Sequence, residues 1–242
     1  MSLLDLNQGK SYVREKITDM MNQLISMGVA GFRVDACKHM WPNDLDAMFN
    51  GMLNNLNDDL GGGKPYIYQE VIDQGGEPVT ADQYFSSGAV TEFKYGLKVA
   101  QNIQQIRYLE TIGQTWGLIP DRYSLTFLNN HDNQRGHGGG GEIITYEQPY
   151  DLKLASAFML AHPYGTPRIM SSYYFSNSDD GPPPNQPTVD SVNATSCNNG
   201  WVCEHRWTGC QPMYAFRGAV KNTGINDWWD NGGNRMDRDK QG

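Results

Sequence analysis

The feature that most constrains the fold is a regular alternation between short β-forming segments and segments with helical periodicity. Residues 11–28 place apolar side chains at helical spacing, and residues 29–36 (VAGFRVDA) follow directly as a short strand. A second helix over 45–56, ended by the glycines at 61–63, and a second strand over 65–72 repeat this order. Strands that alternate with helices form βαβ units, so the chain is predicted to build a parallel sheet.

The same alternation continues through the rest of the chain. It predicts strands at 90–95, 123–130 and 168–174 and helices at 97–109, 151–160 and 213–220. A loop rich in proline and glycine follows residue 175, and a strand-like stretch lies at 225–229. An α/β domain accounts for this pattern whether its sheet is open or closed into a barrel.

Composition excludes two classes of partner. The chain has 19 Lys and Arg against 27 Asp and Glu, a net charge of −8, whereas nucleic-acid binders carry a clustered basic face. The mean hydropathy is −0.60, and no stretch reaches the roughly 18 apolar residues that a membrane span needs. We therefore expect neither a nucleic acid nor a membrane as a partner.

Charged side chains lie at the ends of the predicted strands. Arg33 and Asp35 share one face of the first strand. Glu70 lies near the C-terminal end of the second strand, where α/β proteins bind their ligands. The alternative to a functional role for Arg33 and Asp35 is that they form a buried ion pair that only stabilises the structure. Asp35 and Glu70 would otherwise suit a retaining glycosidase, which needs two carboxyl groups separated by roughly 5–5.5 Å.

Four stretches of the sequence resemble successive signatures of the animal-type α-amylases, which belong to the α-amylase superfamily of glycoside hydrolases. They are GFRVDACKHMW (31–41), YIYQEVID (66–73), FLNNHDNQRGHG (127–138) and AHPYGTPRIMSS (161–172). The resemblance runs from Leu3 to about Trp229.

The resemblance implies a (β/α)8 TIM barrel of which this chain holds only a part. Residues 1–230 would form strands four to eight of the catalytic barrel, and 231–242 would begin a C-terminal β-domain. The first three strands and an inserted domain would then precede Met1.

The activity implied by the resemblance is retaining endo-hydrolysis of internal α-1,4-glucosidic bonds in starch and glycogen. Asp35 matches the nucleophile and Glu70 the general acid/base. Asp132 matches the third carboxylate, which steadies the distorted sugar and helps to keep Glu70 protonated. The implied substrate-binding residues, which would also contact maltooligosaccharides, are Lys38, His39, Ile72, His131 and His137.

Two ions are implied as cofactors. Arg33, Asn130 and Arg168 match three chloride ligands, and we expect that an anion relieves the charge of the two buried guanidinium groups. The carboxylate of Asp5 and the backbone carbonyl of His39 match ligands of a structural calcium ion. Because calcium takes six to eight oxygen ligands, these two residues would form only part of that site.

The cysteines fit an oxidising compartment. Cys197 and Cys203 match a disulfide of the family, which implies a secreted protein, and Asn193 begins a glycosylation sequon. Cys37 and Cys210 have no assigned partner. The complete protein is expected to be a monomer.

Two alternatives remain open at this point. One is an amylase-like protein that binds carbohydrate or serves as a scaffold without catalysis, although such relatives typically lose the catalytic carboxylates. The other is a transglycosylating relative that shares the same residues, which analysis of the products from maltooligosaccharides would separate from a hydrolase.

Overall fold

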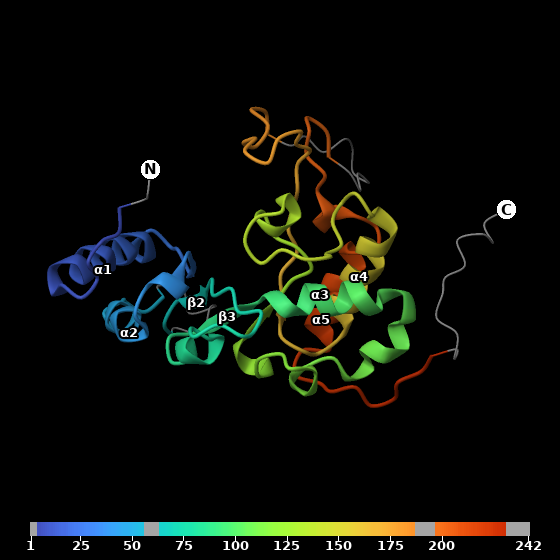
Figure 1. Ribbon diagram of the computed structural model, residues 1–242, viewed down its shortest axis with the longest axis horizontal. Coiled ribbons are helices and arrows are strands. Elements are labelled where there is room, and N and C mark those ends of the chain that lie inside the picture. Colours follow the sequence, from blue (N-terminus) through green and yellow to red (C-terminus); the bar gives the residue numbers. More distant parts are fainter. Residues whose placement is uncertain (1–3, 56–62, 187–196, 231–242) are drawn as a thin grey trace. The chain divides into compact units, whose positions relative to one another are not determined.

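The computed structural model describes residues 4–55, 63–186 and 197–230 (Figure 1). The chain divides into two compact units, Met1–Thr91 and Glu92–Gly242. The sequon at Asn193 and the predicted start of a β-domain at 231–242 lie outside the described residues.

In its described residues, the first unit contains two α-helices and a three-stranded parallel sheet. The elements are α1 (Ser11–Ser26), β1 (Gly31–Val34), α2 (Pro42–Asn50), β2 (Tyr66–Gln69) and β3 (Ala89–Glu92), with short 3-10 helices at Cys37–His39 and Ala81–Tyr84. β2 pairs in parallel with β1 and with β3. The predicted βαβ order is therefore confirmed in this unit.

Helix α2 ends earlier than the apolar periodicity predicts, at Asn50 rather than near residue 56. The reason lies in α1, where Asn22 satisfies the backbone of the turn that follows. Its Oδ1 accepts from the amide of Leu53 at 2.8 Å, and its Nδ2 donates to the carbonyl of Gly51 at 3.3 Å. The tertiary contact with Asn22 and the low helix propensity of Gly51 together end the helix at this point.

The second unit is built around three helices and two short parallel strands. Its main elements are α3 (Phe93–Asn102), β4 (Ser124–Thr126), α4 (Pro149–Ala161), β5 (Thr166–Pro167) and α5 (Gln211–Ala219). Short 3-10 helices lie at Ile103–Thr111, Gln114–Trp116, Asp121–Tyr123, Asn133–Arg135 and Glu204–Arg206. β4 and β5 pair in parallel, with Leu125 opposite Thr166.

The core of the second unit lies among α3, α4 and the segment that leads to β5 (Figure 1). Tyr95 of α3 is fully buried and stacks on Tyr164, with ring centroids 6.0 Å apart. Leu152 and Met159 of α4 pack into the same cluster. This core holds the carboxyl ends of β4 and β5 in place.

Four strand predictions need correction. The strand predicted at 123–130 is only β4 at Ser124–Thr126. The predicted strand at 168–174 is instead β5 at Thr166–Pro167, and Tyr173 forms only an isolated antiparallel bridge with Trp201. β3 ends at Glu92, because α3 begins where the carboxylate of Glu92 accepts from the amide of Lys94. The stretch at 225–229 forms no strand.

No helix in the described ranges is long and apolar enough to cross a membrane.

Candidate active site

Three hydrogen bonds that involve Glu70 join the carboxyl ends of β1 and β2. The amide of Glu70 donates to the carbonyl of Val34 at 2.8 Å, and the carbonyl of Glu70 accepts from the amide of Cys37 at 3.1 Å. The chain turns between these contacts at Ala36, which has a left-handed φ of +51°. The amide of Ala36 donates to Glu70 Oε2 at 2.9 Å. Glu70 is therefore fixed in position by both its backbone and its side chain.

Arg33 joins the two carboxylates that the sequence singles out. Its Nη1 lies 2.5 Å from Asp35 Oδ1, and its Nη2 lies 3.0 Å from Glu70 Oε1. The side chain of Glu70 is only 10% exposed, whereas that of Asp35 is 71% exposed. The structure thus brings Asp35 and Glu70 to one guanidinium group, at the edge where parallel sheets present their ligands.

The electrostatics of Arg33 follow from these neighbours. Burial alone lowers the pKa of the guanidinium group, but the hydrogen bond with Asp35 and the charges of Glu70 and Asp35 outweigh this effect. The pKa of Arg33 is raised as a result. We conclude that Arg33 stays cationic and holds both carboxylates near one point.

Lys38 and Ile72 also meet in this unit. Lys38 Nζ donates to the carbonyl of Ile72 at 2.9 Å and forms an ion pair with Glu77, a partner that sequence reasoning missed. His39 is exposed beside them. Cys37, the residue before Lys38, is buried, and its thiol donates to the carbonyl of Val34 at 3.3 Å.

In the second unit, a tightly bonded turn follows β4. Asn130 Oδ1 accepts from the amides of Asp132 and Asn133 at 3.1 and 2.7 Å. Asn133 Oδ1 accepts in return from the amide of Asn130 at 2.8 Å. Both asparagines are buried, so they fix the backbone on which Asp132 stands.

The turn leaves Asp132 accessible. Its side chain is 35% exposed and lies 3.3 Å from Nε2 of His131, which is 52% exposed. Its carbonyl accepts from the amides of Arg135 and His137, each at 3.0 Å. His131, Asp132 and His137 are therefore held in one compact turn.

The glycines after His137 serve close packing. Gly139 has a φ of +73°, and a Cβ built on it would lie 2.2 Å from the ring of Phe93 in α3. Gly141 likewise leaves no room for a side chain against Leu97. The structure thus gives a packing reason for glycine at these positions.

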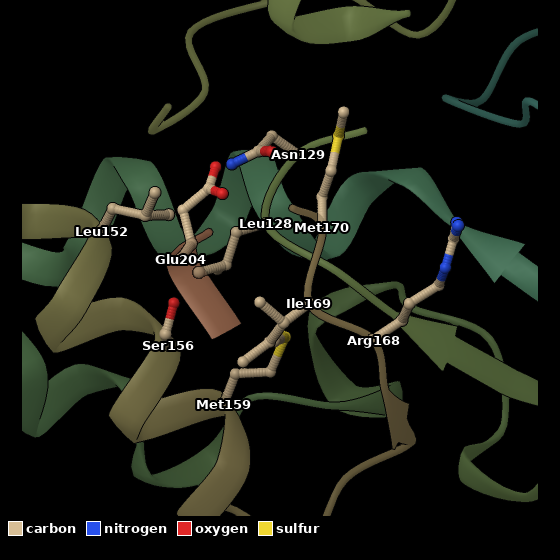
Figure 2. Close-up of a pocket in the computed structure, with 9 residues that line it drawn as sticks. All are labelled: Leu128, Asn129, Leu152, Ser156, Met159, Arg168, Ile169, Met170 and Glu204. Atoms are coloured by element: carbon tan, nitrogen blue, oxygen red, sulfur yellow. The ribbon is translucent and has the colours of Figure 1, made fainter. Parts of the chain in front are cut away.

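Arg168 immediately follows β5. Its amide donates to the carbonyl of Thr126 at 2.8 Å, which extends the pairing of β4 and β5 by one bond. Arg168 also lines a small cavity together with Ser156 and Glu204. Figure 2 shows that its guanidinium group is directed away from these two side chains.

The residues matched to chloride have the donor types that an anion needs, two guanidinium groups and an amide. Arg33 differs from the expectation in one respect, because its charge is already partly balanced within the protein. Its guanidinium group pairs with Asp35 and Glu70, so a bound anion would not be its only countercharge.

The residues matched to calcium do not make a site by themselves. Asp5 is exposed, and its Oδ1 accepts from Gln8 Nε2 at 3.4 Å. Within the described ranges there is no group of three or more His, Cys, Asp or Glu side chains that would hold a metal ion. Asp5 and His39 would provide two oxygen ligands where calcium takes six to eight.

The predicted disulfide is confirmed, because Cys197 and Cys203 are bonded to each other. Cys210 is buried as a free thiol. Glu204 follows the disulfide directly and is 2% exposed. Sequence reasoning assigned it no role, and its position next to a paired cysteine was the only local signal.

Comparison with known proteins agrees with the motifs. The chain matches no protein-family model. It is 52% identical to an alpha-amylase of Pecten maximus over 96% of this chain and 47% of the relative. It is 48% identical to the human alpha-amylase 1B over 97% of this chain and 50% of the relative. The chain thus spans about half the length of the curated relatives it matches.

Solved structures give the fold. A crystal structure of an E249Q mutant of alpha-amylase I from Eisenia fetida, in complex with maltohexaose, matches with a TM-score of 0.85 and 40% identity, over 94% of this chain and 49% of that one. The wild-type enzyme matches with a TM-score of 0.83 and 41% identity, over the same shares of the two chains. The predicted α/β class and partial TIM barrel are therefore confirmed. Over nearly all of its length, the chain is a homologue of the animal α-amylases.

Proposed function

We propose that this chain supplies the catalytic residues of a retaining α-amylase, which hydrolyses internal α-1,4-glucosidic bonds in starch and glycogen. One observation carries the proposal: Arg33 binds both Asp35 and Glu70 at the ends of adjacent parallel strands. Retaining glycosidases need two carboxyl groups close together, one to attack carbon and one to protonate the leaving oxygen.

The two carboxylates have surroundings that suit different roles. Asp35 is largely exposed, so its free oxygen can reach the anomeric carbon of a bound sugar and act as the nucleophile. Glu70 is nearly buried, and the amide of Ala36 and the guanidinium group of Arg33 aim its carboxylate. We assign it the general acid/base role, in which it protonates the leaving oxygen and later takes a proton from water.

Asp132 is the proposed third carboxylate. It lies on the turn fixed by Asn130 and Asn133 and stays accessible to a ligand, as a group that steadies a distorted sugar must be. This role rests on the motif FLNNHDNQRGHG and on the exposure of the side chain.

The proposed substrates are starch, glycogen and maltooligosaccharides. Five residues are assigned to substrate binding from the motifs: Lys38, His39, Ile72, His131 and His137. The maltohexaose complex of the Eisenia fetida enzyme supports a glucan of this kind as the ligand.

Chloride and calcium are proposed as cofactors from the matched residues. Arg33, Asn130 and Arg168 would hold chloride, which supplies a fixed negative charge. Asp5 and His39 would hold part of a calcium site, which would stabilise the fold. We further propose that residues 1–230 belong to the barrel and 231–242 to a C-terminal β-domain, and that the protein is secreted and monomeric without a nucleic-acid or membrane partner.

Starch hydrolysis by the complete natural protein tests the proposal. We expect the wild type to release reducing sugars with retention of the α-configuration, and Glu70→Gln to lose about 10³-fold or more in kcat. Lys16→Gln, a change at an exposed residue of α1, serves as the control. Comparable rates for the wild type and Glu70→Gln would refute the role of Glu70. Binding of glucan without hydrolysis would favour the scaffold alternative, and transfer products would favour a transglycosylase.

A further inference from the structure

Glu204 is a buried carboxylate that has no cationic partner among the ion pairs of the described residues. It is 2% exposed, and none of the ion pairs in the described part of the chain includes it. Burying a carboxylate without a cation costs free energy, so an apolar residue would serve stability better. The backbone before it is also restricted, because Cys203 has a φ of +56° and is bonded to Cys197.

One oxygen of Glu204 is bound to the segment that follows β5. Oε2 accepts from the amide of Ser172 at 2.6 Å. The hydroxyl of Ser172 donates in turn to Oε1 of Gln134 at 3.1 Å. Gln134 belongs to the turn after β4, and its amide donates to the carbonyl of Asn130 at 3.2 Å. A continuous polar chain therefore runs from Glu204 to the turn that carries Asp132.

The other oxygen of Glu204 is unpaired within the described ranges, and its side chain shares a cavity with Asn129, the residue before Asn130. Oε1 has no hydrogen-bond partner among the described residues, and neither has Oδ1 of Asn129. Both side chains line one cavity of about 10 Å³, which Figure 2 shows. This volume is about the space that a single water occupies.

We propose that Glu204 is a positioning residue, which holds the turn around Asp132 in its active geometry by way of Ser172 and Gln134. The inference rests on the proposed function, because it gives that turn a catalytic role. The disulfide at Cys203 fixes one end of this connection, and the buried pair Asn130 and Asn133 fixes the other.

Two substitutions in the complete natural protein separate hydrogen bonding from packing. Glu204→Gln keeps an oxygen that can accept from Ser172, whereas Glu204→Leu has a similar size and accepts nothing. We expect Glu204→Leu to lower kcat roughly 10- to 100-fold with KM changed less than about twofold, since a small misplacement of a reacting group acts on the rate. Glu204→Gln should retain at least about half of the wild-type kcat. Glu147→Leu, at an exposed glutamate of the same unit, is the control.

Hydrogen exchange provides a readout that does not require activity. In Glu204→Leu we expect the amides of residues 127–137 to exchange roughly tenfold faster, while those of α1 keep the wild-type rate. Ser172→Ala removes only the bond to Gln134 and should accelerate exchange in 127–137 as well, so it keeps the test decisive if Glu204→Leu does not fold.

The outcomes separate the inference from the proposed function. A wild type that hydrolyses no starch, with exchange accelerated as expected in the variants, refutes the proposed function but supports the positioning of the turn. Unchanged exchange and unchanged kcat in folded Glu204→Leu overturn the inference. An equal loss of kcat in Glu204→Gln and Glu204→Leu overturns it too, because hydrogen bonding then does not explain the effect.

Discussion

Replacing Arg33 by methionine tests whether the carboxylates of the site are held by one cation. The substitution keeps most of the apolar length of the side chain and removes the guanidinium group. Glu70 then stays buried with the amide of Ala36 as a remaining partner, but without a countercharge. Asp35 loses a partner as well, although water already solvates most of its side chain.

The expected cost follows from the exposure of each partner. Removing one member of a fully buried ion pair costs roughly 3–5 kcal/mol. The side chains of Arg33 and Glu70 are 23% and 10% exposed, so solvent screens part of this, and we expect a loss of about 2–3 kcal/mol in the free energy of unfolding. The pair with Asp35 adds less than about 1 kcal/mol, because Asp35 is mostly exposed.

Urea denaturation of the complete natural protein, followed by circular dichroism, measures this loss. Lys16→Met is the matched control, since Lys16 lies 3.7 Å from Asp19 with both side chains more than 60% exposed, and it should cost about 0.5 kcal/mol or less. The double variant Arg33→Met, Glu70→Gln should recover part of the loss, because no buried charge is then left unpaired. If Arg33→Met costs no more than Lys16→Met, the reasoning about this ion pair is refuted.

Three further predictions concern single residues. Burial raises the pKa of the Cys37 thiol from 9.0 to about 12, so a thiol reagent should label it between about pH 7 and 9 only after unfolding. Because the folded state keeps that proton longer, its contribution to stability should decline as the pH rises from 9 to 12 in urea titrations. Gly139→Ala should cost about 1–3 kcal/mol in the free energy of unfolding, since its Cβ would overlap a ring of α3; an unchanged urea midpoint would contradict this. Arg135 donates to two carbonyls of the 173–180 loop and stacks on two of its aromatic rings. Arg135→Lys should therefore speed proteolysis of that loop, as seen by mass spectrometry, whereas the same change at Arg122, which has a ring contact only, should not.

The order of the elements was predictable because it depends on periodicity along the chain. Helical periodicity predicted α1 and α4, and short runs of β-forming residues predicted the strands between the helices. The helix predicted at 97–109 overlaps α3 only up to Asn102, because the chain continues as 3-10 turns that kink at Gln105. The lengths were less predictable. β5 covers only Thr166–Pro167, because after Arg168 the backbone turns toward Glu204 and Trp201 rather than along the sheet.

Part of the site could also be predicted from sequence. The spacing of Arg33 and Asp35 placed them on one face, and the structure confirms that they are in contact. The link between Arg33 and Glu70 depends on the register of β1 and β2, which aligns Arg33 with Tyr68. Such registers are set by the packing of the whole sheet, so a single sequence contains no direct sign of them.

Glu204 shows why the remaining part could not be predicted. Its partner Ser172 lies 32 residues earlier in the chain, and the contact depends on a turn with positive φ at Cys203. The sequence CEHRW reads as an ordinary polar turn, and only the burial of the carboxylate marks it as unusual.

Trapping the covalent intermediate tests the proposed retaining mechanism most directly. The Glu70→Gln variant of the complete natural protein would be incubated with an α-maltotriosyl fluoride, whose fluoride leaves without protonation. The variant lacks the base that activates water, so the glycosyl-enzyme should accumulate. We predict that mass spectrometry of the digested protein finds the sugar esterified to Asp35. An ester on another residue, or none in a protein whose wild type hydrolyses starch, would contradict the assignment of Asp35 as the nucleophile.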